Sequence, residues 1–187
     1  MAGIIVLVIA FLIALTVIIG AGIFNKLVKL KNLVNASWSD IDVQLKKRYD
    51  LVPNLVEVVK GAGTYEKTTL EAVIKARSAA MGAAAPGDKA KSEGMLTDTL
   101  KSLFALSESY PTLKANENYL LLQNQLKELE DGIERSRRYY NAVVRDFNTL
   151  IESFPSSVVA SAFNFKQAEF FGLSNATAER QPVKAQL

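Results

Sequence analysis

An uninterrupted apolar run near the N-terminus constrains this chain more than any other feature. Residues 4–24 read IIVLVIAFLIALTVIIGAGIF and contain no charged side chain. An α-helix rises about 1.5 Å per residue, so this run forms a helix about 30 Å long, which matches the hydrocarbon core of a bilayer. The sequence therefore predicts a transmembrane helix from which the rest of the chain extends.

The charges beside the apolar run predict its orientation. Residues 1–3 carry no basic side chain, whereas three lysines follow the run, at Lys26, Lys29 and Lys31. By the positive-inside rule the N-terminus lies outside and the body of the protein in the cytoplasm, with the lysines facing anionic lipid headgroups. We expect a single-pass protein of the bacterial inner membrane. A cleaved export signal and an anchor of opposite orientation are the alternatives, and the missing basic n-region disfavours the first.

Two residue types are absent, and their absence excludes several chemistries. Without cysteine and histidine there is no disulfide framework, no Cys/His zinc site, no cysteine nucleophile and no Ser-His-Asp triad. Carboxylate-only metal binding and Ser-Lys chemistry remain open on composition alone. The 22 basic and 19 acidic residues are interleaved, so no nucleic-acid binding is expected. We predict no catalytic, cofactor or metal site, and a protein that is not an enzyme.

The remaining residues predict an all-α fold in which the anchor continues into a long-helix antiparallel bundle. We divide the chain into an anchor (1–25), a bundle (26–173) and a mobile tail (174–187). The first soluble helix continues from the anchor through Pro53, where a kink is expected, to a stop near residues 61–63. Apolar spacing and turn residues then predict helices over 64–81, 95–110 and 113–154, with a surface loop over 82–94 and Pro111 ending the third soluble helix.

The last long helix carries the most regular pattern outside the apolar run. Apolar or aromatic residues recur at every seventh position, at Tyr119, Leu126, Ile133, Tyr140, Phe147 and Phe154. Such a seam is typical of a left-handed coiled coil or of a long bundle helix. Its partner is either the first soluble helix or another chain, and the spacing does not distinguish the two.

A knot of polar residues lies beside Pro53 and is the candidate site of the soluble part. It comprises Arg48, Tyr49, Asp50 and Asn54. Arg48 occupies a position on the apolar stripe of its helix, where an unpaired charge would be costly. We favour a structural ion pair across the bundle, with Glu117, Glu130 or Glu134 as partner, and a ligand pocket is the alternative.

Phenylalanine is concentrated after the last long helix. Five of the nine phenylalanines are Phe154, Phe163, Phe165, Phe170 and Phe171. They either fold back and cover the end of the bundle, or the last four form an exposed contact with a second subunit or a lipid surface.

Four runs resemble the LemA family of bacterial membrane proteins: ASWSDIDVQLKKRYDLVPNLVEVVKG, TLEAVIKAR, SYPTLKANENYLLLQNQLKELED and RRYYNAVVRDFNTLIESFP. The resemblance covers about residues 25–171. It implies an N-terminal anchor followed by an antiparallel helical bundle, and no established catalytic residues. Members commonly carry a His-Glu pair after the family's VKG, where this chain has Tyr65 and Glu66, so a role resting on that histidine does not carry over.

These features together predict a scaffold or adaptor that works by assembly. Copies bury apolar surface against one another, and anchoring concentrates them in two dimensions, so weak lateral contacts suffice. The expected partners are the lipid bilayer, further copies of the chain and other envelope proteins. The alternative is a ligand-sensing regulatory module that binds a small molecule or peptide near Arg48 and modulates a membrane protease or transporter.

Overall fold

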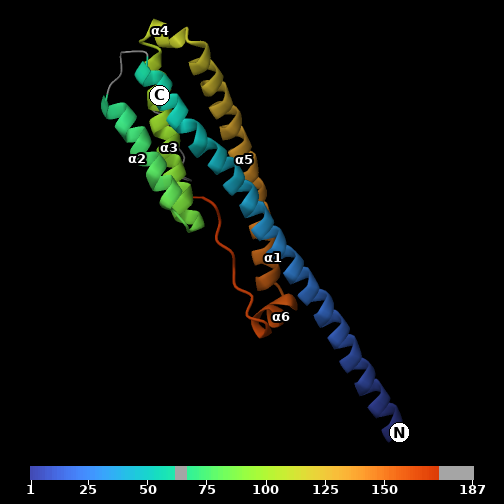
Figure 1. The fold of residues 1–187 in the computed structure, drawn as a ribbon. Coiled ribbons are helices and arrows are strands. Elements are labelled where there is room, and N and C mark those ends of the chain that lie inside the picture. Colours follow the sequence, from blue (N-terminus) through green and yellow to red (C-terminus); the bar gives the residue numbers. More distant parts are fainter. Residues whose placement is uncertain (62–66, 173–187) are drawn as a thin grey trace, which may run out of the picture. The chain divides into compact units, whose positions relative to one another are not determined.

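The computed structural model of the chain describes residues 1–61 and 67–172, and within these ranges it is all-α, as predicted. Figure 1 traces its helices in chain order. They are α1 (Ala2–Gly61), α2 (Lys67–Gly82), α3 (Pro86–Ser107), α4 (Pro111–Lys114), α5 (Glu117–Glu152) and α6 (Ser156–Ala162). Thr64, where the sequence predicts the start of the second soluble helix, and the predicted tail over 174–187 lie outside the described residues.

Helix α1 is a single element that contains both the apolar run and the first soluble helix. Pro53 lies inside it, and the helix ends at Gly61, which confirms the predicted stop. The large apolar side chains from Ile4 to Ile19 are 43% to 72% exposed. Among the described residues, α1 is the one helix long and apolar enough to cross a membrane. Beyond the run the apolar stripe is buried, at Leu27, Val34, Ile41, Leu45, Val52, Leu55 and Val59.

The chain divides into two compact units, and α1 and α5 contribute to both. Unit 1 contains residues 1–39 and 139–168, and unit 2 contains residues 40–138 and those from 169 onward. In unit 1 the chain beyond α6 returns along α5, because the Asn148 amide donates to the Ala168 carbonyl at 2.9 Å and accepts from the Ala168 backbone N–H at 2.8 Å. Phe165 packs there between Phe24 and Phe147, with ring centroids 5.9 and 6.5 Å away.

The core of unit 2 is built from helix faces of period three to four. Small residues of α2, Ala76 and Ala80, are buried and allow close packing, while Leu96, Leu100 and Leu103 form the inner face of α3. On α5 the predicted seam is buried at Tyr119, Leu126 and Ile133 in unit 2, and at Tyr140 and Phe147 in unit 1. Phe154 is an exception at 85% exposure, because α5 ends at Glu152 and the seven-residue register ends with it.

The loop predicted over residues 82–94 is wrong. Helix α3 begins at Pro86, so that only residues 83–85 separate it from α2. A proline at the first helical position is favourable, since the N–H it lacks would have no partner within the helix. Pro111 likewise begins the short helix α4, besides following the end of α3. The predicted loop therefore covers about the first two and a half turns of α3, which carry the buried polar residues Lys89 and Glu93.

Candidate functional site

Arg48 is the centre of a buried polar cluster in unit 2. The side chain comes from α1 and is nearly inaccessible, at 1% exposure. Its Nη1 lies 2.9 Å from Oε2 of Glu130 on α5 and 3.5 Å from Oε2 of Glu93 on α3, and its Nη2 donates to Thr97 Oγ1 at 2.7 Å. The predicted ion pair is confirmed with Glu130, whereas Glu134 pairs with Arg138 instead. One guanidinium thus links three helices.

Tyr49 extends the cluster toward α2. Its hydroxyl donates to Glu93 Oε1 and lies 3.3 Å from the Ala80 carbonyl oxygen. Lys89 Nζ donates to the same carbonyl at 3.2 Å and lies 5.7 Å from the centroid of the Tyr49 ring. We define the polar cluster as Arg48, Tyr49, Lys89, Glu93, Thr97 and Glu130.

Arg77 of α2 resolves a problem that Pro53 creates. Because proline has no N–H, the Tyr49 carbonyl one turn earlier loses its helical hydrogen bond. Arg77 Nε donates to that carbonyl at 2.8 Å. A buried carbonyl without a partner costs free energy, so this contact stabilises α1 where the proline would weaken it. Arg77 lies where the apolar stripe of α2 would otherwise continue, and this bond accounts for its place.

Burial raises the pKa of two groups of the cluster, Glu93 and Tyr49. It raises the pKa of Glu93 above its ordinary 4.5, and the Tyr49 hydroxyl and the charges of Arg48 and Lys89 only partly oppose this. Burial and the neighbouring Glu93 also raise the pKa of Tyr49. The tyrosine therefore stays a hydrogen-bond donor at neutral pH and does not act as a base. Glu93 Oε2 accepts no hydrogen bond among the described residues and lies 3.5 Å from Arg48 Nη1.

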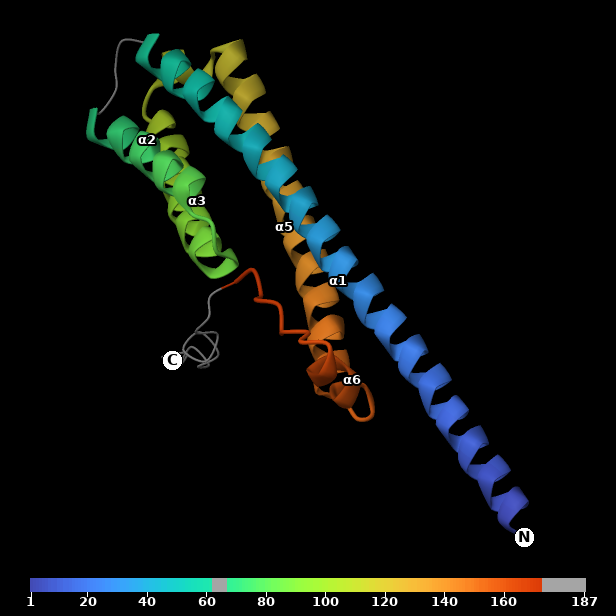
Figure 2. The same cartoon turned by 60° about the horizontal axis from the view of Figure 1, so that its bottom comes forward.

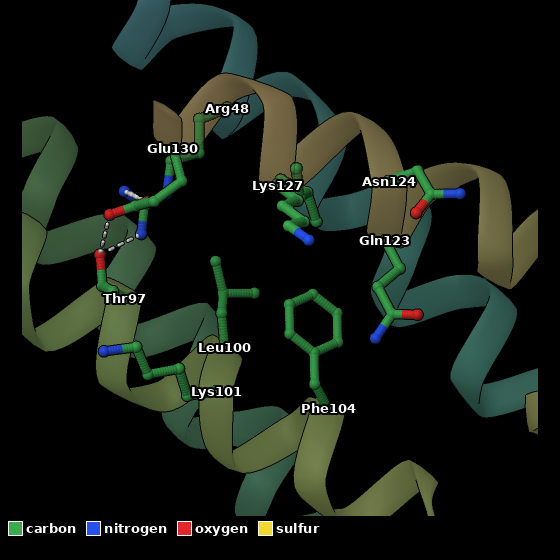
Figure 3. Close-up of a pocket in the computed structure, with 10 residues that line it drawn as sticks. Arg48, Thr97, Leu100, Lys101, Phe104, Gln123, Asn124, Lys127 and Glu130 are labelled. Atoms are coloured by element: carbon green, nitrogen blue, oxygen red, sulfur yellow. Dashed lines mark hydrogen bonds and ion pairs between the residues drawn. The ribbon is translucent and has the colours of Figure 1, made fainter. Parts of the chain in front are cut away.

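A cleft of about 380 Å³ opens beside the cluster, between α3 and α5 (Figure 3). Leu100 and Phe104 project from α3 toward Gln123 and Lys127 of α5. The lining consists of Arg48, Thr97, Leu100, Lys101, Phe104, Gln123, Asn124, Leu126, Lys127 and Glu130. An apolar floor and a basic rim suit an anionic ligand that carries an aromatic or acyl group. Within residues 1–61 and 67–172, no three His, Cys, Asp or Glu side chains gather closely enough to hold a metal ion.

Two members of the predicted polar knot do not join the cluster. Asp50 and Asn54 are exposed, because a helix turns by about 100° per residue and places them away from the buried positions 48, 52 and 55. The sequence reading also missed Glu93 and Thr97, since it placed the first in a loop. The spacing of Lys89, Glu93, Leu96 and Leu100 after Pro86 is the helical signal that identifies them.

The other predicted residues lie mainly at the surface. Lys26, Lys29 and Lys31 are exposed on α1 beyond the apolar run. Phe163 and Phe170 are 60% and 46% exposed, and Phe165 is half-buried. Phe171 is fully buried, with the Arg137 guanidinium 5.0 Å from its ring centroid, so its predicted place in an exposed contact surface is wrong. Phe170 has an exposed ring, whereas the ring of Phe171 has the Arg137 guanidinium of α5 over it.

Comparison with known proteins identifies relatives of this chain by sequence. A model of the LemA family matches residues 37–186, which include the polar cluster and begin after the apolar run. Magnetosome protein MamQ 2 of Paramagnetospirillum magneticum is 26% identical over 174 residues, covering 79% of this chain and 64% of the relative. Magnetosome protein MamQ of Magnetospirillum gryphiswaldense is 24% identical with the same coverage. Protein LemA of Metamycoplasma hominis is 24% identical, covering 80% of this chain and 69% of its own length. The chain therefore spans slightly less than two thirds of the magnetosome relatives.

Proposed function

Because the chain belongs to the LemA family and carries a helix able to cross a membrane, we propose that it is a membrane-anchored scaffold or adaptor. It works by assembling with copies of itself and with other envelope proteins. The observation that carries the proposal is the apolar surface of α1, whose large side chains are exposed all around the helix from Ile4 to Ile19. Lipid is the solvent in which such a surface is stable.

The basic residues after the run give the proposed orientation. Lys26, Lys29 and Lys31 are exposed and follow the span, while residues 1–3 have no basic side chain. We place the N-terminus outside and the chain beyond the apolar run in the cytoplasm, at the inner membrane of a bacterium.

The polar cluster supports a structural role for the bundle. Arg48 is held by two carboxylates and a hydroxyl, each supplied by another helix of unit 2. Such a cluster links α1, α3 and α5 and fixes which faces of these helices turn outward. The resulting surface, rather than a reaction centre, is then what the protein presents to partners.

Exposed apolar side chains in unit 2 offer places for these contacts. Ile74 and Met81 are seven residues apart on α2, so they lie on one face, and both are at least 44% exposed. Anchoring raises the local concentration, so a small apolar contact of this kind can hold copies together. Relatives named magnetosome proteins provide a precedent in the family for a role in a cellular structure.

Energy transfer between labelled copies in vesicles tests the assembly. The chain has no cysteine, so Ser39→Cys at an exposed position supplies one thiol for donor and acceptor dyes. We expect transfer to persist when lipid is increased about tenfold and to fall when unlabelled protein is added. Transfer that falls with lipid dilution to the random-encounter level contradicts assembly.

A matched pair of variants locates the contact on α2. Ile74→Glu with Met81→Glu introduces charge on the proposed face and should reduce transfer several-fold. Lys75→Glu with Ser78→Glu changes exposed polar positions of the same helix and serves as the control. Equal effects of the two pairs would exclude this face.

The cleft favours a second candidate function, that of a ligand-sensing module that modulates a membrane protease or transporter. Its volume suits a small ligand, and Lys101 and Lys127 provide ammonium groups near the apolar floor. Phenylacetate, a small aromatic carboxylate, should raise the thermal midpoint by a few degrees, and Lys127→Ala should abolish the shift without lowering the basal midpoint. No shift in the unmodified protein argues against this candidate. Arg48 is unsuitable for this test because its loss disturbs the core.

A further inference from the structure

The outer side of α6 is apolar although it faces solvent in unit 1. Ser156 and Ala160, one turn apart, point inward and are buried. Val158 is 62% exposed, and Phe154 and Phe163, which flank the helix, are 85% and 60% exposed. We call Phe154, Val158 and Phe163 the α6 face. Three large apolar side chains exposed within ten residues favour an apolar environment, although Ser161 and Ala162 of α6 are exposed as well.

The α6 face lies at the end of the apolar run of α1. The ring of Phe163 is 4.7 Å from the ring of Phe24, centroid to centroid, and Phe24 is the last residue of that run. Figures 1 and 2 both show α6 at the end of α5 and beside α1, and the N-terminal part of α1 continues past it. A helical run of about 30 Å spans the hydrocarbon core from end to end, so Phe24 lies at the boundary between acyl chains and headgroups.

The charge around this boundary is mainly positive, although Glu152 borders it and accepts a hydrogen bond from Gln167. Residues 24–39 and 153–168 contain four lysines, at positions 26, 29, 31 and 166, and no aspartate or glutamate. All four lysines are exposed, and Lys31 Nζ lies 5.8 Å from the centroid of the Phe165 ring. An apolar surface bordered by lysines is complementary to acyl chains beneath anionic headgroups.

We infer that the α6 face docks on the same membrane that α1 crosses, with its apolar side chains among the acyl chains and the lysines among anionic headgroups. This inference rests on the proposed anchoring of α1 and adds a second membrane contact far from it in sequence. The contact would hold α6 and the end of α5 against the bilayer surface, so that the span of α1 is no longer the sole attachment of unit 1. Interfacial insertion of this kind scales with apolar area and with the anionic lipid content.

An environment-sensitive label on the α6 face tests the inference in the full chain. Val158→Cys supplies the single thiol, which is labelled with nitrobenzoxadiazole. The labelled protein is placed, one copy each, in bilayer discs made of phosphatidylcholine and phosphatidylglycerol. We expect a blue-shifted emission and quenching by bromine-labelled acyl chains. Ser39→Cys is the control, since it is an exposed site of unit 1 about 22 Å along α1 from Phe24. Quenching at position 158 should exceed that at position 39 several-fold.

Two outcomes overturn the inference. A label at position 158 that emits and quenches like the one at position 39 shows that the face is in water. Protection that occurs only in discs with two or more copies assigns the face to another protomer. Phe154→Cys is a second labelling site that should give the same result as Val158→Cys, and its side chain is so exposed that replacing it leaves the core intact. Failed anchoring is distinguishable, because the protein would then be missing from the discs.

Discussion

Replacement of Arg48 by methionine lowers the free energy of unfolding of the bundle by about 3–5 kcal/mol. The guanidinium is 1% exposed and is the charge that faces both Glu93 and Glu130. Methionine fills a similar volume, so the main loss is electrostatic: Glu93 remains buried with no opposite charge from α1. Denaturant unfolding of the detergent-solubilised protein, followed by circular dichroism, measures the change.

Control variants separate this effect from the general loss of an arginine. Arg138 forms an exposed ion pair with Glu134, and Arg138→Met should change stability by less than about 1 kcal/mol. Adding Glu93→Gln to Arg48→Met removes the unpaired carboxylate and should restore part of the loss. Similar effects of Arg48→Met and Arg138→Met would contradict the structural role of the polar cluster.

The deficit of Arg48→Met also depends on pH in a defined direction. Burial raises the pKa of Glu93 above 4.5, and the charge of Arg48 opposes this, so the pKa in the variant is higher still. A carboxyl group with a raised folded-state pKa favours the fold at low pH, and this contribution is lost as pH rises through that pKa. We therefore expect Arg48→Met to lower the free energy of unfolding less at about pH 5 than at about pH 8. Adding Glu93→Gln should remove this dependence on pH.

Phe171→Ala lowers the free energy of unfolding by about 3–5 kcal/mol, because the ring is fully buried and its loss leaves a cavity. It also removes the ring that Arg137 covers at 5.0 Å. Phe170→Ala, one residue earlier, is the matched control, since that ring is 46% exposed and its loss should cost about 1 kcal/mol or less. The same denaturant titration compares the two, and equal costs would show that the segment after α6 does not hold Phe171 in the core.

Periodicity predicted the helices of this protein better than their boundaries. The seven-residue seam identified the buried positions of α5 from Tyr119 to Phe147, because a helix interior repeats one contact geometry. It was wrong at Phe154, where α5 has ended. The predicted loop over 82–94 contains Pro86, and Pro111 was predicted to end a helix, yet each of these prolines begins one. A proline excludes a helix on one side only, and which side it is depends on contacts beyond the local sequence.

The sequence predicted Arg48 and one of its two carboxylate partners, but not the other. Arg48 on an apolar stripe required a buried partner, and Glu130 is one. The second partner, Glu93, was assigned to a loop and missed. Pro53 showed that the Tyr49 carbonyl lacks a helical donor, but only the packing of α2 reveals that Arg77 supplies it. Local sequence identifies an unsatisfied group, whereas tertiary structure selects the group that satisfies it.

The polar cluster and the apolar surfaces have complementary roles in the proposed function. The cluster links α1, α3 and α5, and under the proposal the exposed apolar side chains of α1, α2 and α6 provide the contacts with lipid and with partners. A rigid interior of this kind is an advantage for a scaffold, because weak contacts between copies add only when each copy presents the same surface.

The mass of the protein after mild detergent extraction tests the central claim most directly. Light scattering coupled to size-exclusion chromatography gives the protein mass within the micelle, which can be compared with the 20.5 kDa of one chain. The proposed assembly predicts a homo-oligomer of several chains that persists on dilution. A strict monomer at every concentration would contradict the claim and leave an anchored bundle that does not assemble.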